Sequence, residues 1–310
     1  MSRRSSLMLS TEEPSAVALH PATVPSTGVS LLTKGSEAEA LEFLAARPIH
    51  TVIMASFIRD NGLVSERNRG SFHCYRDCHG QLEGVALIGH ATLFETQSEA
   101  ALDAFAQLVH SSDTVHMIMG EQHRVERFWQ HFTRVGPVPH QVRRELLFEQ
   151  RWTMLEQRWP VEVQQSVPGL RLAARDDLDL VMRTHARMAV EEFGLDDPLA
   201  VDPIGFPRRC ARRIEQGRVW VLIENGSLVF KADIVSETPE AIYLEGVYVE
   251  PEKRGQGYGL SCVSQLSRRL LSRAGSICLF VNEQNQKAQA FYRSAGYRLQ
   301  SYYTTIVVEK

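Results

Sequence analysis

From Val29 onward, the hydrophobic residues follow two alternating patterns. Segments with an apolar residue at every third or fourth position predict helices, and short apolar or alternating runs predict β-strands. The predicted helices cover about 36–47, 49–63, 99–110, 121–132, 176–192, 206–216, 258–272 and 285–295. The predicted strands cover about 71–76, 82–90, 115–119, 142–148, 170–173, 219–224, 227–235, 241–249 and 277–282, followed by a final strand pair. This alternation predicts an α/β (α+β) fold with a mixed central sheet flanked by helices.

The helix starts and the domain boundary are read from polar and helix-breaking residues. Ser36 and Asp176 are expected to cap helices, and Ser36 has Glu at the third following position, as in a capping box. Prolines and Gly169 interrupt the pattern between residues 150 and 168. We therefore predict an accessory domain over 29–165 and a second domain over 166–310. Residues 1–28 are rich in Ser, Thr, Pro and Ala, which predicts a disordered tail.

The two predicted domains resemble each other at one place. Met119–Gln122 and Val281–Gln284 each end an apolar strand. Each precedes a helix that carries two adjacent aromatic residues, Phe128-Trp129 in one case and Phe291-Tyr292 in the other. This match suggests a diverged internal duplication.

Composition and charge exclude several classes of protein. The chain has 34 Lys and Arg against 37 Asp and Glu, a net charge of -3, so it is not a broadly basic nucleic-acid binder and we expect no nucleic-acid partner. No run of about 18 apolar residues is present, so we expect no membrane span. The apolar run after Arg4 is too short for an export signal. Five scattered cysteines do not form a disulfide framework, which favours a cytoplasmic location.

The sequence contains one candidate metal site, a zinc site. Cys74 and Cys78 are flanked by His73 and His79, and thiolate and imidazole are zinc ligands. No second cysteine pair follows, and these residues straddle a predicted turn that ends in Gly80. We therefore interpret them as strand and turn residues and expect no metal.

The most informative segment is Val247–Gly259, in which a strand runs into a loop with glycine at three alternate positions and a helix follows. Glycines let backbone N–H groups approach a ligand, and the helix N-terminus adds unpaired donors and partial positive charge. With Arg254 nearby, this combination predicts a pyrophosphate site. No Gly-Lys-Ser/Thr follows as in a P-loop, and Cys262 stands where a dinucleotide fingerprint has its third glycine.

These residues resemble a known family. Arg254-x-x-Gly257-x-Gly259, after a strand, is similar to the acetyl-CoA pyrophosphate motif of the GNAT superfamily of N-acyltransferases. Asn285-x-x-Ala288-x-x-Phe291-Tyr292, followed by Gly296-Tyr297, resembles the second cofactor segment of that family. The resemblance covers about residues 169–310.

The first half matches the family only in its order of elements. Phe94–Glu99, at the expected place of the phosphate turn, has no glycine and contains two acids that would repel a pyrophosphate. We interpret it as a degenerate GNAT-like domain that does not bind CoA. The whole chain looks like two-domain bacterial proteins with an extra domain before a C-terminal acetyltransferase domain.

The resemblance implies direct transfer of an acetyl group from acetyl-CoA to a primary amine within a ternary complex. It assigns the cosubstrate site to Val247, Val249, Arg254, Gly255, Gln256, Gly257, Tyr258, Gly259 and Asn285. The N–H of Val247 would receive the thioester oxygen and that of Val249 the pantetheine arm. Tyr292 would protonate the leaving thiolate, with a packed aromatic as the alternative. Glu245 would accept the amine proton, because a carboxylate among apolar strand neighbours is costly unless it faces a cleft.

The acceptor side is less defined. Glu191 and Glu192 end a predicted helix where the family places acceptor-binding residues, and a solvated helix end is the alternative. Asp196 and Asp197 add acidity that suits a cationic amine, and His185 is interpreted as a packing or surface residue. The partner is a small-molecule or peptide amine whose identity stays open, as does the oligomeric state. A module that binds acyl-CoA without turnover and signals through the first domain is the alternative function.

Overall fold

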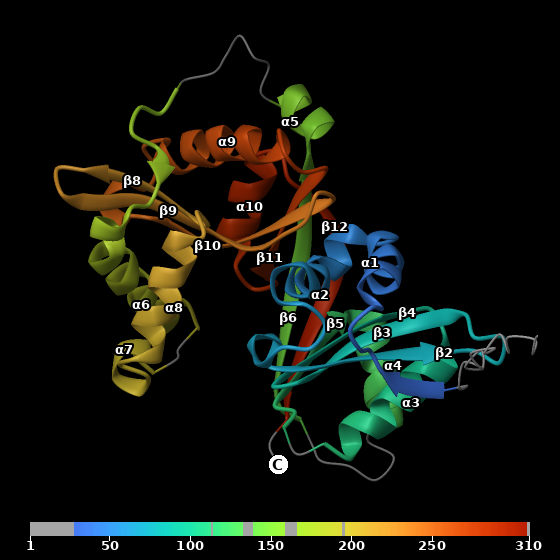
Figure 1. Cartoon of the computed structure of the whole chain (residues 1–310). Coiled ribbons are helices and arrows are strands. Elements are labelled where there is room, and N and C mark those ends of the chain that lie inside the picture. The colour runs from blue at the N-terminus through green and yellow to red at the C-terminus, as the bar shows by residue number, and fades with distance from the viewer. Residues whose placement is uncertain (1–27, 113, 133–138, 159–165, 194–195, 309–310) are drawn as a thin grey trace, which may run out of the picture.

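The computed structural model describes residues 28–112, 114–132, 139–158, 166–193 and 196–308 (Figure 1). Its strands are β1 (Gly28–Leu31), β2 (Gly70–Arg76), β3 (Leu82–Gly89), β4 (Ala91–Thr96), β5 (Met117–Glu121), β6 (Pro139–Arg151), β7 (Arg171–Leu172), β8 (Val219–Glu224), β9 (Ser227–Glu237), β10 (Ala241–Val249), β11 (Ser276–Asn282) and β12 (Arg298–Val308). Its α-helices are α1 (Glu37–Ala45), α2 (Pro48–Asn61), α3 (Glu99–His110), α4 (Gln122–Phe132), α5 (Trp152–Arg158), α6 (Leu178–Phe193), α7 (Pro198–Val201), α8 (Gly205–Glu215), α9 (Tyr258–Leu271) and α10 (Gln286–Ser294). Among these helices none is long and apolar enough to cross a bilayer.

All described strands join one 12-stranded mixed sheet, in the order β1-β2-β3-β4-β5-β12-β6-β11-β10-β9-β8-β7. The last strand of each half lies in the other half's part of the sheet. β6 pairs with β11, and β12 pairs with β5, while β6 and β12 also pair with each other. Figure 1 shows these two long strands side by side through the middle of the molecule. The two halves therefore share a continuous backbone hydrogen-bond network.

Two strand pairs are parallel and all other described pairs are antiparallel. Ala91–Leu93 of β4 pairs with Met117–Met119 of β5, and Ala241–Tyr243 of β10 pairs with Ser276–Cys278 of β11. In the second pair both strands continue for several residues beyond the last paired position. β10 and β11 thus separate toward their carboxyl ends and leave unpaired backbone along the gap between them.

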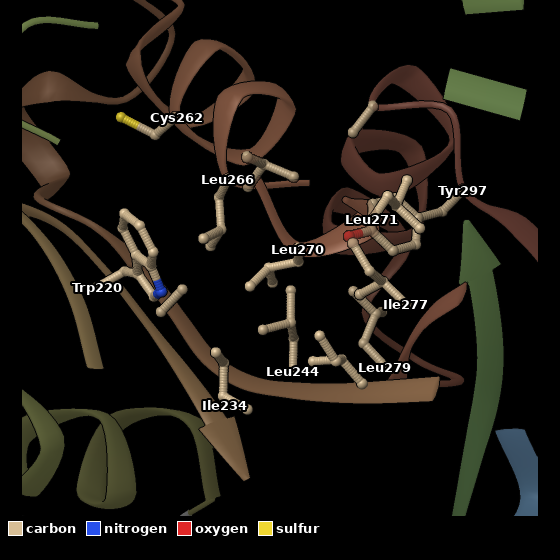
Figure 2. Close-up of a cluster of buried hydrophobic side chains, with 14 of the residues drawn as sticks. Trp220, Ile234, Leu244, Cys262, Leu266, Leu270, Leu271, Ile277, Leu279 and Tyr297 are labelled. Atoms are coloured by element: carbon tan, nitrogen blue, oxygen red, sulfur yellow. The ribbon is translucent and has the colours of Figure 1, made fainter. Parts of the chain in front are cut away.

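The larger core lies between the C-terminal half of the sheet and helices α9 and α10. Alternate residues of β10, Ile242 and Leu244, point into it, and Leu266 and Leu270 of α9 pack from above. Figure 2 shows Leu244, Leu266, Leu270 and Tyr297 in this cluster. Phe148 of β6 is a fully buried member, so the N-terminal half supplies part of this core.

The opposite face of the sheet is covered by helices from both halves. Ile49 and Val52 of α2 pack with Tyr243 of β10 and Tyr303 of β12. α6 and α8 cover the neighbouring strands β8 and β9 on the same side. α2 therefore brings the N-terminal half against the strand that carries Glu245.

Most predicted elements are present, and the differences have local causes. Phe94–Thr96 continues strand β4, which leaves only Gln97 and Ser98 as the turn before α3, and the Ser98 hydroxyl accepts from Ala101 N at 3.4 Å. The predicted final strand pair is wrong, because one strand, β12, reaches both neighbours. α5 occupies part of the region predicted as an interruption.

The two predicted caps are only partly confirmed. Ser36 is the N-cap residue of α1, but its side chain makes no cap hydrogen bond; the Glu37 carboxylate accepts from Gly35 N, which precedes the helix, at 2.6 Å. Asp176 lies in a 3-10 turn that precedes α6, and the Asp177 carboxylate accepts from Ala174 N at 2.7 Å. In both cases a carboxylate binds a backbone N–H group that precedes the helix.

Candidate active site

β10 carries a bulge where it separates from β11. Its pairing with β9 shifts register between Glu245 and Tyr248, so Gly246 and Val247 face no register partner. Gly246 has φ 59°, and a Cβ there would lie 2.9 Å from Asp233 Oδ2 and 3.0 Å from Lys231 Nζ. Only glycine fits this position, and the bulge leaves Gly246 and Val247 without a register partner in β9.

The glycine-rich loop delivers an uncapped helix N-terminus beside the end of β10. Gly255 and Gly257 have φ of 74° and 87°, and a Cβ on either would meet nothing within 4 Å. Gly257 is the N-cap of α9 and offers no side-chain acceptor, so the first N–H groups of this helix have no side-chain cap. Backbone conformation, rather than crowding, is the reason for these two glycines.

Gly259 has a different role, because it brings three elements into contact. A Cβ on Gly259 would lie 3.0 Å from Val249 Cγ2 and 3.2 Å from Phe291 Cε2. α9 therefore packs against the end of β10 and against α10. The Arg254 guanidinium is exposed and donates through Nε to Val249 O at 2.9 Å, and Gln256 Nε2 donates to Glu252 O at 2.7 Å. Both side chains stabilise the loop in this form of the protein.

α10 holds Tyr292 and begins at the predicted second segment. The Asn285 side chain is the N-cap of α10 and accepts from Ala288 N at 3.0 Å. The half-buried Tyr292 ring packs against Phe291 and Tyr297, with ring centroids 5.1 and 5.6 Å apart. A packing role is thus seen directly for Tyr292, and a capping role for Asn285.

Glu245 is on the face of β10 opposite the larger core. Its side chain is exposed to solvent, and the surrounding protein atoms partly desolvate its carboxyl group. This desolvation raises the pKa of Glu245; the charge of Asp233 acts in the same direction, and those of Arg213 and Lys231 oppose it. Within the described residues Glu245 forms no hydrogen bond or ion pair. Its carboxylate is a free proton acceptor with an elevated pKa, as a general base requires.

A buried ion pair beneath the bulge was not found from the sequence. Lys231 Nζ donates to Asp233 Oδ2 at 2.6 Å, and both side chains are at most 2% exposed. Arg213 of α8 lies 3.5 Å from the same oxygen, and His185 Nδ1 lies 3.8 Å from it. Desolvation lowers the pKa of His185 to about 4, so this imidazole is neutral near pH 7. The sequence does contain a signal for this ion pair: two charged residues lie within the apolar run of β9, and charged residues are rarely buried unless they are paired.

The residues predicted on the acceptor side are partly described. Glu191 is exposed on α6, and the side chain of Glu192 lies outside the described residues. Asp197 caps the short helix α7 by accepting from Leu199 N at 2.9 Å, and Asp196 is exposed. None of them forms a described contact with Glu245.

The matching place in the N-terminal half is closed by charged side chains. Glu95 follows the last parallel-paired residue of β4 by two positions, as Glu245 does in β10. Arg47 and Arg124 bind Glu95 at 3.0 and 3.2 Å, and Arg47 also binds Glu121 at 2.6 Å. The remaining cavity is only about 20 Å³, space for about one water molecule. Pantetheine does not fit there.

A metal site finds no support among the described side chains. Cys74 is buried and lies 3.2 Å from the Ser30 hydroxyl, and Cys78 is exposed. In the described parts of the chain no three metal-ligating side chains gather at one point.

Comparison with known families adds to this geometry. Residues 215–299 match the family described as "acetyltransferase (GNAT) domain". The C-terminal half carries a GNAT acetyltransferase domain. A curated relative, the UPF0039 protein of Schizosaccharomyces pombe, is 29% identical over 82 residues, which is 26% of this chain. The match spans about half of that relative, 55% of its length.

Solved structures extend the likeness to both halves. A Drosophila protein (TM-score 0.65, 11% identity), a tandem GNAT protein from the clavulanic acid biosynthesis pathway (0.56, 12%) and a GNAT-family acetyltransferase from Colwellia psychrerythraea (0.54, 13%) each match over 91% of this chain and 99% of their own. At these identities the likeness establishes the fold. The chain thus shares the fold of a tandem GNAT protein across both of its halves.

Proposed function

We propose that this GNAT protein transfers an acetyl group from acetyl-CoA to a primary amine in its C-terminal half. The single observation that supports this most strongly is the separation of β10 from β11 beside the uncapped N-terminus of α9. The gap exposes backbone donors to an extended pantetheine arm, and the helix N-terminus supplies donors and positive potential for the pyrophosphate.

The chemistry follows from where the side chains lie. The neutral amine attacks the thioester carbon, and Glu245 accepts its proton. The N–H of Val247, freed from strand pairing by the bulge, stabilises the oxyanion that develops. When the carbon–sulfur bond breaks, Tyr292 donates its phenolic proton to the thiolate and leaves free CoA. The transfer takes place within one ternary complex of protein, acetyl-CoA and amine, because in this direct attack no residue of the protein becomes acetylated. The described cysteines form no disulfide, which is consistent with the cytoplasmic location that we also propose.

A panel of amines tests this function. Purified full-length protein is mixed with acetyl-CoA and each amine, and free thiol and acetylated product are measured together. We expect both to appear in equal amounts with at least one amine. Tight binding of acetyl-CoA with no turnover across the panel would instead indicate a non-catalytic acyl-CoA sensor.

Two variants separate the roles of the proposed acid and base. Tyr292→Phe removes one proton donor and keeps the packed ring, so kcat should fall by roughly 10²- to 10⁴-fold with little change in the KM for acetyl-CoA. Glu245→Gln should lose most activity at low pH, where the amine is protonated, and recover partly at high pH. An unchanged rate for Tyr292→Phe would reduce that residue to packing. A pH-independent loss for Glu245→Gln would make it an orienting group.

A further inference from the structure

A second carboxylate lies near Glu245 and comes from the other half of the chain. Side chains alternate along a strand, and Leu146 and Phe148 of β6 point into the core beneath α9. Glu145 therefore lies on the opposite face, the one that carries Tyr243 and Glu245. Its register partners are Asn282, at the end of β11, and Tyr303 of β12. The exchanged strand thus places Glu145 beside the open end of the β10–β11 gap.

Neither carboxylate forms an ion pair within the described part of the chain. Within the described residues Glu145 receives one long hydrogen bond, from Thr305 Oγ1 at 3.4 Å, and it has no ion pair there. The nearby cations are engaged elsewhere: Arg143 donates to Gln141 Oε1 at 3.1 Å, and Arg213 lies 3.5 Å from Asp233. The equivalent glutamate of the N-terminal half, Glu95, is bound by two arginines. The C-terminal half therefore has the corresponding acid, Glu245, but no arginine in the described structure binds it.

A mostly buried tyrosine with no hydrogen bond in the described structure lies in the same region. Tyr243 is 91% buried, since its exposed fraction is 9%, and within the described residues its hydroxyl forms no hydrogen bond. Glu245 and Glu145 lie near enough to raise the pKa of Tyr243, after the larger effect of burial, so the phenol stays protonated. Asp233, the register partner of Glu245, has an unpaired buried Oδ1. The lone pairs of the Tyr243 hydroxyl are thus free to accept a hydrogen bond from a ligand that carries N–H groups.

The two carboxylates also oppose each other's ionisation. Burial raises the pKa of Glu145, and the charge of Glu245 raises it further, while Thr305 and Arg143 lower it. Like charges that share a partly buried site ionise together only when a cation accompanies them. A bound cationic ligand would relieve this repulsion.

We propose that Glu145 is a specificity residue that binds a second positive charge of the acceptor, so that the preferred acceptors are diamines or larger polyamines. This inference rests on the proposed function for the reacting end. Glu245 receives the nitrogen that attacks the thioester, and Glu145 holds a protonated nitrogen farther along the same molecule. The N-terminal half then contributes to acceptor recognition through β6 without binding CoA itself.

A matched pair of amines tests the assignment. Wild-type protein and the Glu145→Gln variant are compared with 1,4-diaminobutane and with n-butylamine, which has the same carbon chain and one charge fewer. We expect kcat/KM for the diamine to fall about 10- to 100-fold, chiefly through KM, the range for loss of a charge-assisted hydrogen bond. The value for butylamine should stay within about threefold. Glu145→Asp should retain a preference for the diamine.

Glu149→Gln is the control for the strand. Glu149 lies on the same face of β6, is 1% exposed and is bound by Arg151 at 2.9 Å rather than by groups of the gap. This variant should keep the wild-type preference, and melting curves should show that all variants are folded. Equal losses for both amines in Glu145→Gln, or no loss for either, would overturn the inference.

Calorimetric titration of the diamine in the presence of CoA, without turnover, separates the two proposals. Binding that weakens in Glu145→Gln but never leads to acetyl transfer would contradict the proposed function and support the acceptor site. Acetyl transfer to amines that is independent of Glu145 would support the function and contradict this inference. A wild-type protein that neither binds nor acetylates the diamine would also contradict it.

Discussion

Glu245 and Glu95 occupy equivalent strand positions in the two halves, but their charged neighbours differ. Each follows the last parallel-paired residue of its strand by two positions. Glu95 is held by Arg47 and Arg124, and Glu245 has no ion-pair partner in the described structure. An ionisable group that is kept partly desolvated and unpaired costs stability, and such groups concentrate at functional sites.

That cost predicts a stability gain on neutralising Glu245. Its pKa is raised in the folded state by desolvation. Ionisation therefore destabilises the fold at pH values above the folded pKa, and this penalty disappears below the unfolded pKa of about 4.3. Glu245→Gln should raise the melting temperature at pH 8 and leave it unchanged near pH 4. A lower melting temperature at pH 8 would show that the carboxylate is stabilised by contacts that the account omits.

At the scale of elements, the sequence predicts the features that local patterns determine and misses those that depend on pairing between distant segments. The limits of β10 and the start of α9 follow from apolar runs and glycines, and the structure has them as predicted. The exchange of β6 and β12 could not be predicted, because register between segments about 150 residues apart leaves no local periodic signal. The position of Glu145 was missed for the same reason, since its role depends on neighbours distant in sequence. The pair Lys231–Asp233 is local, and two charges in an apolar strand could have indicated it.

The charged cluster that fills the N-terminal gap should be a large contributor to stability. Glu121 binds Arg47 at 2.6 Å and lies 3.2 Å from Arg124, with side-chain exposures of 9, 25 and 10%. Glu121→Ala leaves two partly buried guanidiniums short of charge, and the loss of unfolding free energy should be about 3 kcal/mol. Urea denaturation measures it.

Glu99→Ala is the matched control for that measurement. Its pair with Arg127 is exposed and screened by solvent, so removal should cost much less stability than Glu121→Ala does. A loss of similar size in both variants would mean that the cluster is no more than surface charge.

At the scale of the whole molecule, the exchanged strands make the two halves depend on each other. β6 separates β11 from β12 and contributes Leu146 and Phe148 to the core of the C-terminal half. The predicted boundary at residue 165 would cut the chain after this strand. The cosubstrate site therefore has its motifs in one half and part of its support in the other.

A fragment that covers residues 166–310 tests this dependence. Without β6 it loses ladder partners for β11 and β12 and exposes the core that Phe148 fills, so we expect no cooperative unfolding transition and no binding of acetyl-CoA. Co-expression with residues 1–165 should restore both. A fragment that folds alone and binds acetyl-CoA with full affinity would show that the exchange is dispensable.

The central claim is that one chain holds one cosubstrate site, at the N-terminus of α9. Calorimetric titration of full-length protein with acetyl-CoA tests it most directly, alongside Gly257→Ala and Gly257→Glu. Both substitutions carry the same backbone strain, since Gly257 has φ 87° and open space around it. Only glutamate adds a carboxylate against the pyrophosphate. We predict one site per chain, retained in Gly257→Ala and lost in Gly257→Glu. Two sites per chain, or undiminished affinity in Gly257→Glu, would contradict the account.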